Sequence, residues 1–194
     1  MIRFNNYREL DAEASDLIQQ LFFTADSETS AFPSFVIRWM GFNGWMECVT
    51  GAETDADMIS QLADEKRLSD AYDSIIQSDA EFRHHVNQFA VMLPVLNVRD
   101  VKKKLGRDAF WRYSRDELMA EVILYNVKRR PVDWINGETP TWKQVILTIY
   151  AVRCNLFHGS KSPTNFRDHQ LVVSCDNIIK IFIIRSECLD WWDE

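Results

Sequence analysis

The sequence predicts an all-α protein, a helical bundle that occupies residues 1–194 as a single domain. Apolar residues recur at the spacing of an amphipathic helix over nearly the whole chain. The chain is 46% hydrophobic and 26% charged, with only 6 glycines and 5 prolines, so it is neither disordered nor a flexible linker. At 194 residues it is long enough to bury a core without disulfides or metal ions.

The first half of the chain contains five predicted helices. The first lies over residues 10–22, where one face carries Leu10, Ala14, Leu17, Ile18, Leu21 and Phe22. The second runs from Phe32 to Val49, and Pro33 fits its first turn because the N–H that proline lacks has no partner there. Three shorter helices follow over residues 58–62, 68–76 and 82–93, and Pro94 ends or kinks the last one.

Charge is distributed unevenly in the middle of the chain. The net charge is −7, yet residues 99–130 carry 10 basic against 5 acidic side chains. A basic face on an acidic protein can attract a polyanion, and a solvated helical surface is the alternative explanation. Within this segment a helix is predicted around Arg115–Arg129, which stops at Pro131.

A loop and two long helices are predicted for the remainder. Residues 131–140 contain an Asn-Gly turn signal, after which Thr139 caps a helix that begins at Pro140. Gly159 follows the last apolar residue of that helix, as a left-handed C′ residue would. The last helix carries apolar residues from Leu171 onward, and the length of the pattern favours a helix over a strand at residues 178–184.

Other composition features exclude several classes of protein. No apolar run approaches the roughly 20 residues of a membrane helix, so we expect no membrane association. The start of the chain lacks the basic and then apolar segments of a secretory signal, so we expect a cytoplasmic protein. The four cysteines show no disulfide or metal-ligand spacing, so we expect reduced thiols. The histidines have no zinc-ligand spacing and no phosphate-binding glycine loop is present, so we expect neither metal nor cofactor.

Residues 152–159 place polar side chains at the end of an otherwise apolar helix. Arg153 and His158 are separated by about 140° of rotation and roughly 7.5 Å of rise, but the long arginine can reach beyond the helix end. Asn155 lies close to the face of His158. The alternative is a structural role, in which Arg153 binds carbonyls, His158 faces the negative end of the helix and Gly159 caps it.

This stretch resembles the Arg-x(4–6)-His motif of HEPN domains (higher eukaryotes and prokaryotes nucleotide-binding), in particular prokaryotic members whose motif reads R-N-N-L-F-H-G. The matching residues are Arg153, Asn155, Leu156, Phe157, His158 and Gly159. Cys154 stands where the family usually has Asn, Asp or His.

Two further segments resemble the same family. One is the predicted helix that contains Trp39, Phe42 and Asn43, which in these proteins packs beside the motif helix. The other is the start of the last helix, with Asp168 and Leu171. The resemblance covers roughly residues 32–50 and 141–186, and it leaves the first thirty residues and the basic segment unexplained.

The resemblance implies a two-fold homodimer that acts as a metal-independent endoribonuclease, a toxin or an anti-phage defence effector. Histidine titrates near neutral pH, so His158 would be the acid and base, and Arg153 would stabilise the charged phosphorane. Asn155 would position a phosphate oxygen or the His158 ring. Attack by the ribose 2′-OH would leave a 2′,3′-cyclic phosphate and a 5′-OH.

Further residues are expected to support this site. Asn43 is a polar residue in an apolar helix, so we expect it to hydrogen-bond to the motif helix, and Cys154 is the second supporting residue. Charge alone suggests the RNA contacts, which are Lys161, Lys102, Lys103, Lys104 and Arg107.

Two alternatives to a ribonuclease stay open. A HEPN-like domain without catalysis would serve as an RNA-binding or dimerisation module, or as the partner of an antitoxin or another defence protein. An unrelated helical protein would use Arg153 and His158 only to end a helix.

Overall fold

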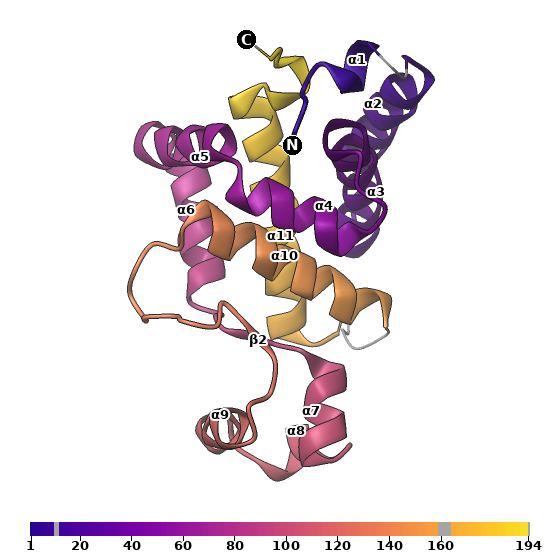
Figure 1. The fold of residues 1–194 in the computed structure, drawn as a ribbon. Helices are drawn as coiled ribbons and strands as arrows, with labels where there is room; N and C mark the ends of the chain where they lie inside the picture. The colour runs from indigo at the N-terminus through magenta and orange to yellow at the C-terminus, as the bar shows by residue number, and fades with distance from the viewer. Residues whose placement is uncertain (10–11, 159–163, 194) are drawn as a thin grey trace.

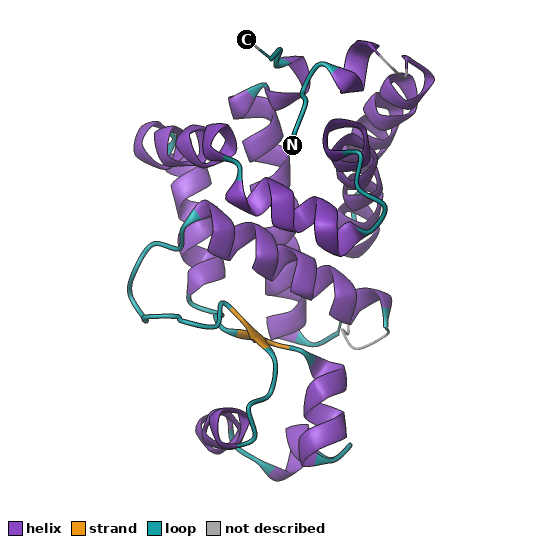
Figure 2. Ribbon diagram, viewed as in Figure 1, coloured by secondary structure: helices purple, strands orange, loops and turns teal. Residues whose placement is uncertain are grey.

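The protein is described by a computed structural model that covers residues 1–9, 12–158 and 164–193. Within these residues the chain forms eleven α-helices, a short 3₁₀-helix and one two-stranded sheet, which confirms the all-α prediction (Figures 1 and 2). Leu10 and the predicted C′ residue Gly159 lie outside the described residues.

Six helices form the first half of the chain: α1 (Asn6–Glu9), α2 (Ala12–Ser27), α3 (Ala31–Thr50), α4 (Asp55–Asp64), α5 (Lys66–Ser78) and α6 (Ala80–Ala90). The five predicted helices correspond to α2 to α6. The predicted apolar face of α2 is buried only in part, because Ile18 lies in the core but Leu17 is 60% exposed.

Helix α11 (Phe166–Ser186) runs through the middle of the bundle, and α3, α5 and α6 pack against it (Figure 1). The Arg38 guanidinium on α3 donates to the Asp176 carboxylate on α11 at 2.7 Å, and the Ser34 hydroxyl donates to the same carboxylate. Arg38 and Asp176 are both buried. Arg38 also lies 3.0 Å from the Asp26 carboxylate on α2, so this charge network joins α3 to both α2 and α11.

Helix α10 (Trp142–Phe157) crosses the bundle and packs against α4 and α5. Thr141 is its N-cap: the Thr141 hydroxyl accepts from the Gln144 backbone N–H, and the Gln144 side chain accepts from the Thr141 N–H. The prediction that Thr139 caps a helix beginning at Pro140 is therefore wrong by two residues, because this reciprocal capping box satisfies two free N–H groups at once.

Residues 98–127 form a small lobe below the bundle in Figure 2. Strand β1 (Val95–Leu96) pairs antiparallel with β2 (Arg129–Arg130), and between the strands lie α7 (Val98–Leu105), α8 (Ala109–Arg112) and α9 (Arg115–Leu124). The lobe has a hydrophobic core of its own: Val101, Leu105, Ala109, Leu118, Val122 and Val127. The basic segment of the sequence is therefore a folded unit that the β1–β2 ribbon joins to the bundle.

The prediction of one helix over Arg115–Arg129 is wrong in its second half. Helix α9 ends at Leu124, and Asn126 adopts a left-handed backbone with φ of 48°. The chain then turns back, and Arg129 and Arg130 pair with β1. Apolar spacing alone does not reveal this end, because the strand partner lies more than thirty residues earlier in the sequence.

The two ends of the described chain lie together at the top of the bundle in Figure 1. The Phe4 backbone N–H donates to the Asp193 carboxylate at 3.0 Å, and η1 (Cys188–Asp190) follows α11 closely. Among the described residues, none of the helices has the length and apolar character needed to cross a membrane.

Candidate nucleic-acid interface

His158 lies at the C-terminal end of α10, with its side chain exposed. Its backbone N–H donates to the Cys154 carbonyl at 3.2 Å, which ends the helix. Its Nε2 atom lies 3.4 Å from a terminal guanidinium nitrogen of Arg99 at the start of α7. An imidazole that accepts from Arg99 through Nε2 carries its proton on Nδ1. The structure thus pairs His158 with an arginine that the sequence did not single out.

Arg153 lies on the preceding turn of α10 and faces α4. Its Nη2 atom is 2.8 Å from the Asp55 carboxylate, and its guanidinium carbon is 4.5 Å from the centre of the Phe157 ring. The buried Nε atom has no hydrogen-bond partner among the described residues. The side chain is 24% exposed, so the guanidinium is oriented by Asp55 and Phe157 while part of it faces solvent.

Asn155 is buried in the fold, and its side chain contacts the backbone at the start of α7. Its amide oxygen accepts from the Val98 N–H at 3.1 Å, and its amide nitrogen donates to the Leu96 carbonyl at 2.8 Å. Both polar groups of the side chain are satisfied by the backbone where β1 leads into α7. The predicted role of Asn155 on a phosphate oxygen or the His158 ring is corrected: this side chain ties the lobe to α10.

Helix α3 meets the motif helix through an aromatic contact. The Trp39 and Tyr150 rings stack with centres 6.1 Å apart, and the Arg153 guanidinium carbon lies 5.9 Å from the Trp39 ring centre. The expected hydrogen bond from Asn43 to α10 is absent from the described structure, since the buried Asn43 Oδ1 has no partner there. The packing of these two helices therefore depends on ring contact.

Cys154 and Tyr150 lie one turn apart on the face of α10 next to Arg153. Burial raises the pKa of the Tyr150 phenol to about 12, and the neighbouring Cys154 and Asp55 act in the same direction. Tyr150 is therefore a neutral hydrogen-bond donor at physiological pH. Cys154 is half-buried.

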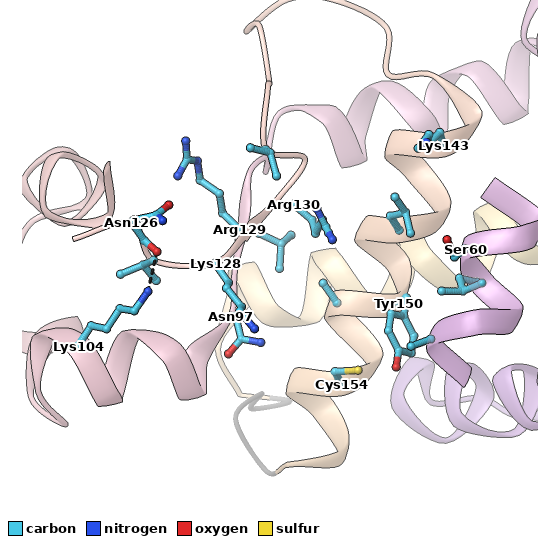
Figure 3. A pocket seen from close by; sticks show the side chains of 17 residues that line it. Ser60, Asn97, Lys104, Asn126, Lys128, Arg129, Arg130, Lys143, Tyr150 and Cys154 are labelled. Carbon is cyan, nitrogen blue, oxygen red and sulfur yellow. Dashed lines mark hydrogen bonds between the residues drawn. The ribbon is translucent and has the colours of Figure 1, made fainter. Parts of the chain in front are cut away.

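A groove of about 760 Å³ separates this face of α10 from the β1–β2 ribbon (Figure 3). We call it the cationic groove, and its lining residues are Ala56, Ile59, Ser60, Val95, Asn97, Lys104, Asn126, Val127, Lys128, Arg129, Arg130, Val132, Lys143, Leu147, Tyr150, Ala151 and Cys154. Five of these are cationic, and no described lining residue is acidic. The groove thus combines positive charge with a concave, partly open shape, which favours anionic ligands.

Two of the three groove lysines have carboxylate partners, whereas the Lys128 side chain has no ion pair or hydrogen bond among the described residues and only its backbone N–H contacts Asp100. Lys104 lies 3.1 Å from the Asp100 carboxylate and donates to the Asn126 carbonyl, and Lys143 lies 2.6 Å from the Asp64 carboxylate. Arg129 and Arg130 have neither a side-chain hydrogen bond nor an ion pair within the part of the chain that the structure describes. Together with Lys128, they carry the least compensated positive charge in the groove.

Asp100 organises the outer wall of the groove. Burial opposes the charged form of its carboxyl, but the Lys128 backbone N–H at 2.7 Å and the Lys104 ammonium outweigh this effect and hold the pKa below its usual value. The same carboxylate therefore joins α7 to the residues that enter β2. It fixes the position of the basic strand relative to the lobe.

The predicted RNA contacts separate into three groups. Lys104 lines the groove, whereas Lys102, Lys103 and Arg107 are exposed on the lobe outside it. Lys161 lies outside the described residues. Lys128, Arg129, Arg130 and Lys143 line the groove but are not among the predicted RNA contacts, although the Lys-Arg-Arg run before Pro131 is a visible signal in the sequence.

No group of three or more His, Cys, Asp or Glu side chains that could hold a metal ion occurs among the described residues. A scan against protein-family models and searches against curated proteins and solved structures find no match to the chain. The function is therefore inferred from the side chains around His158 and from the cationic groove.

Proposed function

We propose that the protein is a metal-independent endoribonuclease of the HEPN type that cleaves RNA at the His158 end of α10. The observation that carries this proposal is the exposed imidazole of His158, whose Nε2 lies 3.4 Å from the Arg99 guanidinium, with Arg153 on the preceding turn. An imidazole that contacts one arginine, at a helix end that carries a second arginine on the preceding turn, is suited to move protons beside a charged phosphate.

The reaction follows from these groups. When the Arg99 guanidinium moves from Nε2 of His158 to the phosphate, that nitrogen removes the proton from a ribose 2′-OH, and the freed oxygen attacks the adjacent phosphorus. Arg99 and Arg153 stabilise the negative charge that gathers on the phosphorane oxygens. The bond to the 5′-oxygen then breaks as that oxygen receives a proton. The products are a 2′,3′-cyclic phosphate and a 5′-OH.

A second copy of the chain would supply a second imidazole to the same cleft, so that one His158 removes a proton while the other delivers one. Exposed aromatic rings at the end of α10 and the start of α11 support this part of the proposal: Phe157 is 50% exposed and Phe166 is 79% exposed. Large apolar side chains on a surface are typical of interaction sites. The proposed functional unit is a two-fold dimer.

A second candidate function is an RNA-binding module without catalysis, in a toxin–antitoxin or defence system. The specific observation in its favour is that two motif side chains are engaged within the fold. Arg153 is held by Asp55 at 2.8 Å, and Asn155 is bonded to the backbone of β1 and α7. In that case the His158 end would hold RNA and leave it intact.

Cleavage of total RNA in EDTA separates the two functions. We expect the wild-type protein to cut RNA, and we expect His158→Ala and Arg153→Ala to lower the rate on the order of a hundredfold or more. His84→Ala is the matched control, because His84 is an exposed histidine on α6. Equal cleavage by His158→Ala and by the wild type would overturn the proposed ribonuclease. RNA binding without cleavage by a folded wild type would support the module.

A further inference from the structure

We infer that the cationic groove binds a single strand of RNA, with phosphates along β2 and bases against the floor. The inference rests on the proposed ribonuclease function only for the cleavage of the bound strand. The binding of RNA to the groove does not depend on that function. Cys154 marks one end of the groove, and His158 lies about one helical turn beyond it on α10. A strand in the groove would therefore lead toward the proposed reacting groups.

The position of the uncompensated charge favours phosphates along β2. Arg130 extends from β2 toward α10, and Arg129 extends to the other side of the strand (Figure 3). Neither guanidinium has an ion-pair partner in the described residues, so a phosphate can bind without displacing an internal carboxylate. Arginine presents several N–H donors in a planar fork that matches two phosphate oxygens.

The floor of the groove has a different character from its rim. Buried or partly buried apolar and aromatic side chains line it, namely Ile59, Val95, Leu147 and Tyr150. A ligand made only of phosphate has no group to place against this floor, whereas unstacked bases do. Aromatic and apolar surfaces beside a positively charged track are typical of proteins that bind single strands.

The size of the groove favours a single strand over a duplex. About 760 Å³ lies within the range of sites that enclose small ligands. Duplex RNA keeps its bases stacked inside the helix, so they cannot contact the apolar floor of this partly open groove. We therefore assign single-stranded RNA to this groove.

The test measures binding in a protein that cannot cleave. In the His158→Ala background, fluorescence anisotropy with a short labelled single-stranded oligoribonucleotide compares two double variants. Arg129→Ala with Arg130→Ala removes the two groove arginines, and Lys102→Ala with Lys103→Ala removes two exposed charges of the same basic segment. We expect the first pair to weaken binding on the order of tenfold at about 0.1 M salt, and the salt slope to fall by about 1.4. The second pair changes both quantities much less.

Three results would overturn the inference: equal losses in the two double variants, binding of duplex RNA as tight as of single strands, or full competition by free ATP at equal concentration. These results leave the proposed ribonuclease standing if wild-type cleavage still needs His158. Conversely, binding that depends on Arg129 and Arg130 but leads to no cleavage by the wild type supports the groove and contradicts the ribonuclease.

Discussion

Individual side chains of the motif have different roles that their spacing does not reveal. The sequence correctly places Arg153, Asn155 and His158 at the end of one helix, but their partners come from distant parts of the chain. Asp55, which holds Arg153, lies about a hundred residues earlier, and Arg99 approaches His158 only because the lobe folds back. Helix geometry gives the relative direction of side chains, whereas tertiary contacts decide which one stays exposed.

Asn155 gives the first prediction about stability. Asn155→Ala leaves the Val98 N–H and the Leu96 carbonyl without their partner, so we expect a loss of about 1–3 kcal/mol in the free energy of unfolding. Urea denaturation followed by circular dichroism measures this loss. Asn136→Ala, at an exposed asparagine of the 131–140 loop, is the matched control and should change stability by less than about 0.5 kcal/mol. Equal midpoints for the two variants would contradict the structural role of Asn155.

Among the elements, the long helices are the ones that could be predicted. Apolar periodicity predicts α3 and α11 because their buried residues recur every three or four positions, although α3 is apolar on most of its surface. The ends of α9 and α10 could not be placed in the same way. One depends on pairing between β1 and β2, and the other depends on which of two nearby threonines forms the capping box.

The joint between α7 and β2 gives a prediction about pH. The pKa of Asp100 in the folded protein is below its usual value, which is near 4. The carboxylate therefore stabilises the fold fully at pH values above that usual pKa. This contribution is lost as the pH falls through the folded-state pKa. At about pH 7 we expect Asp100→Asn to be less stable than the wild type by about 1 kcal/mol, the difference between a charge-assisted and a neutral hydrogen bond. The measurement is urea unfolding of both proteins at several pH values. A difference that stays constant down to about pH 3 would contradict this account.

At the scale of the whole molecule, the basic residues that cluster in the sequence also cluster in space. The basic residues 99–130 form the lobe and β2. Lys104, Lys128, Arg129 and Arg130 line the groove and Arg130 extends toward α10, whereas other cations of the segment lie outside it (Figure 3). The sequence indicated a basic face but not its location, because the groove is created by the way the β1–β2 ribbon and Asn155 hold the lobe. The cations of that face were assigned to RNA on charge alone, and most of the ones so named lie outside the groove.

The proposed dimer gives a prediction about mass. Sedimentation equilibrium should give twice the chain mass of 22.8 kDa. Phe166→Glu places a charge on a ring that is 79% exposed in one copy, so we expect it to shift the protein toward the monomer and lower cleavage without unfolding it. Phe23→Glu, at a 69% exposed ring on α2, is the control. A wild type that sediments as a monomer while it cleaves RNA would contradict the two-fold pairing.

The most direct test of the proposed cleavage at His158 is the mass of the RNA fragments made in EDTA. The substrate is a short single-stranded oligoribonucleotide, compared with the same oligonucleotide carrying a 2′-deoxyribose at the cut position. We predict fragments with a 2′,3′-cyclic phosphate from the wild type, none from His158→Ala, and none at the deoxy position, because the attacking 2′-OH is missing there. Fragments that persist at the deoxy position, or that His158→Ala also produces, would contradict the proposed site and its chemistry.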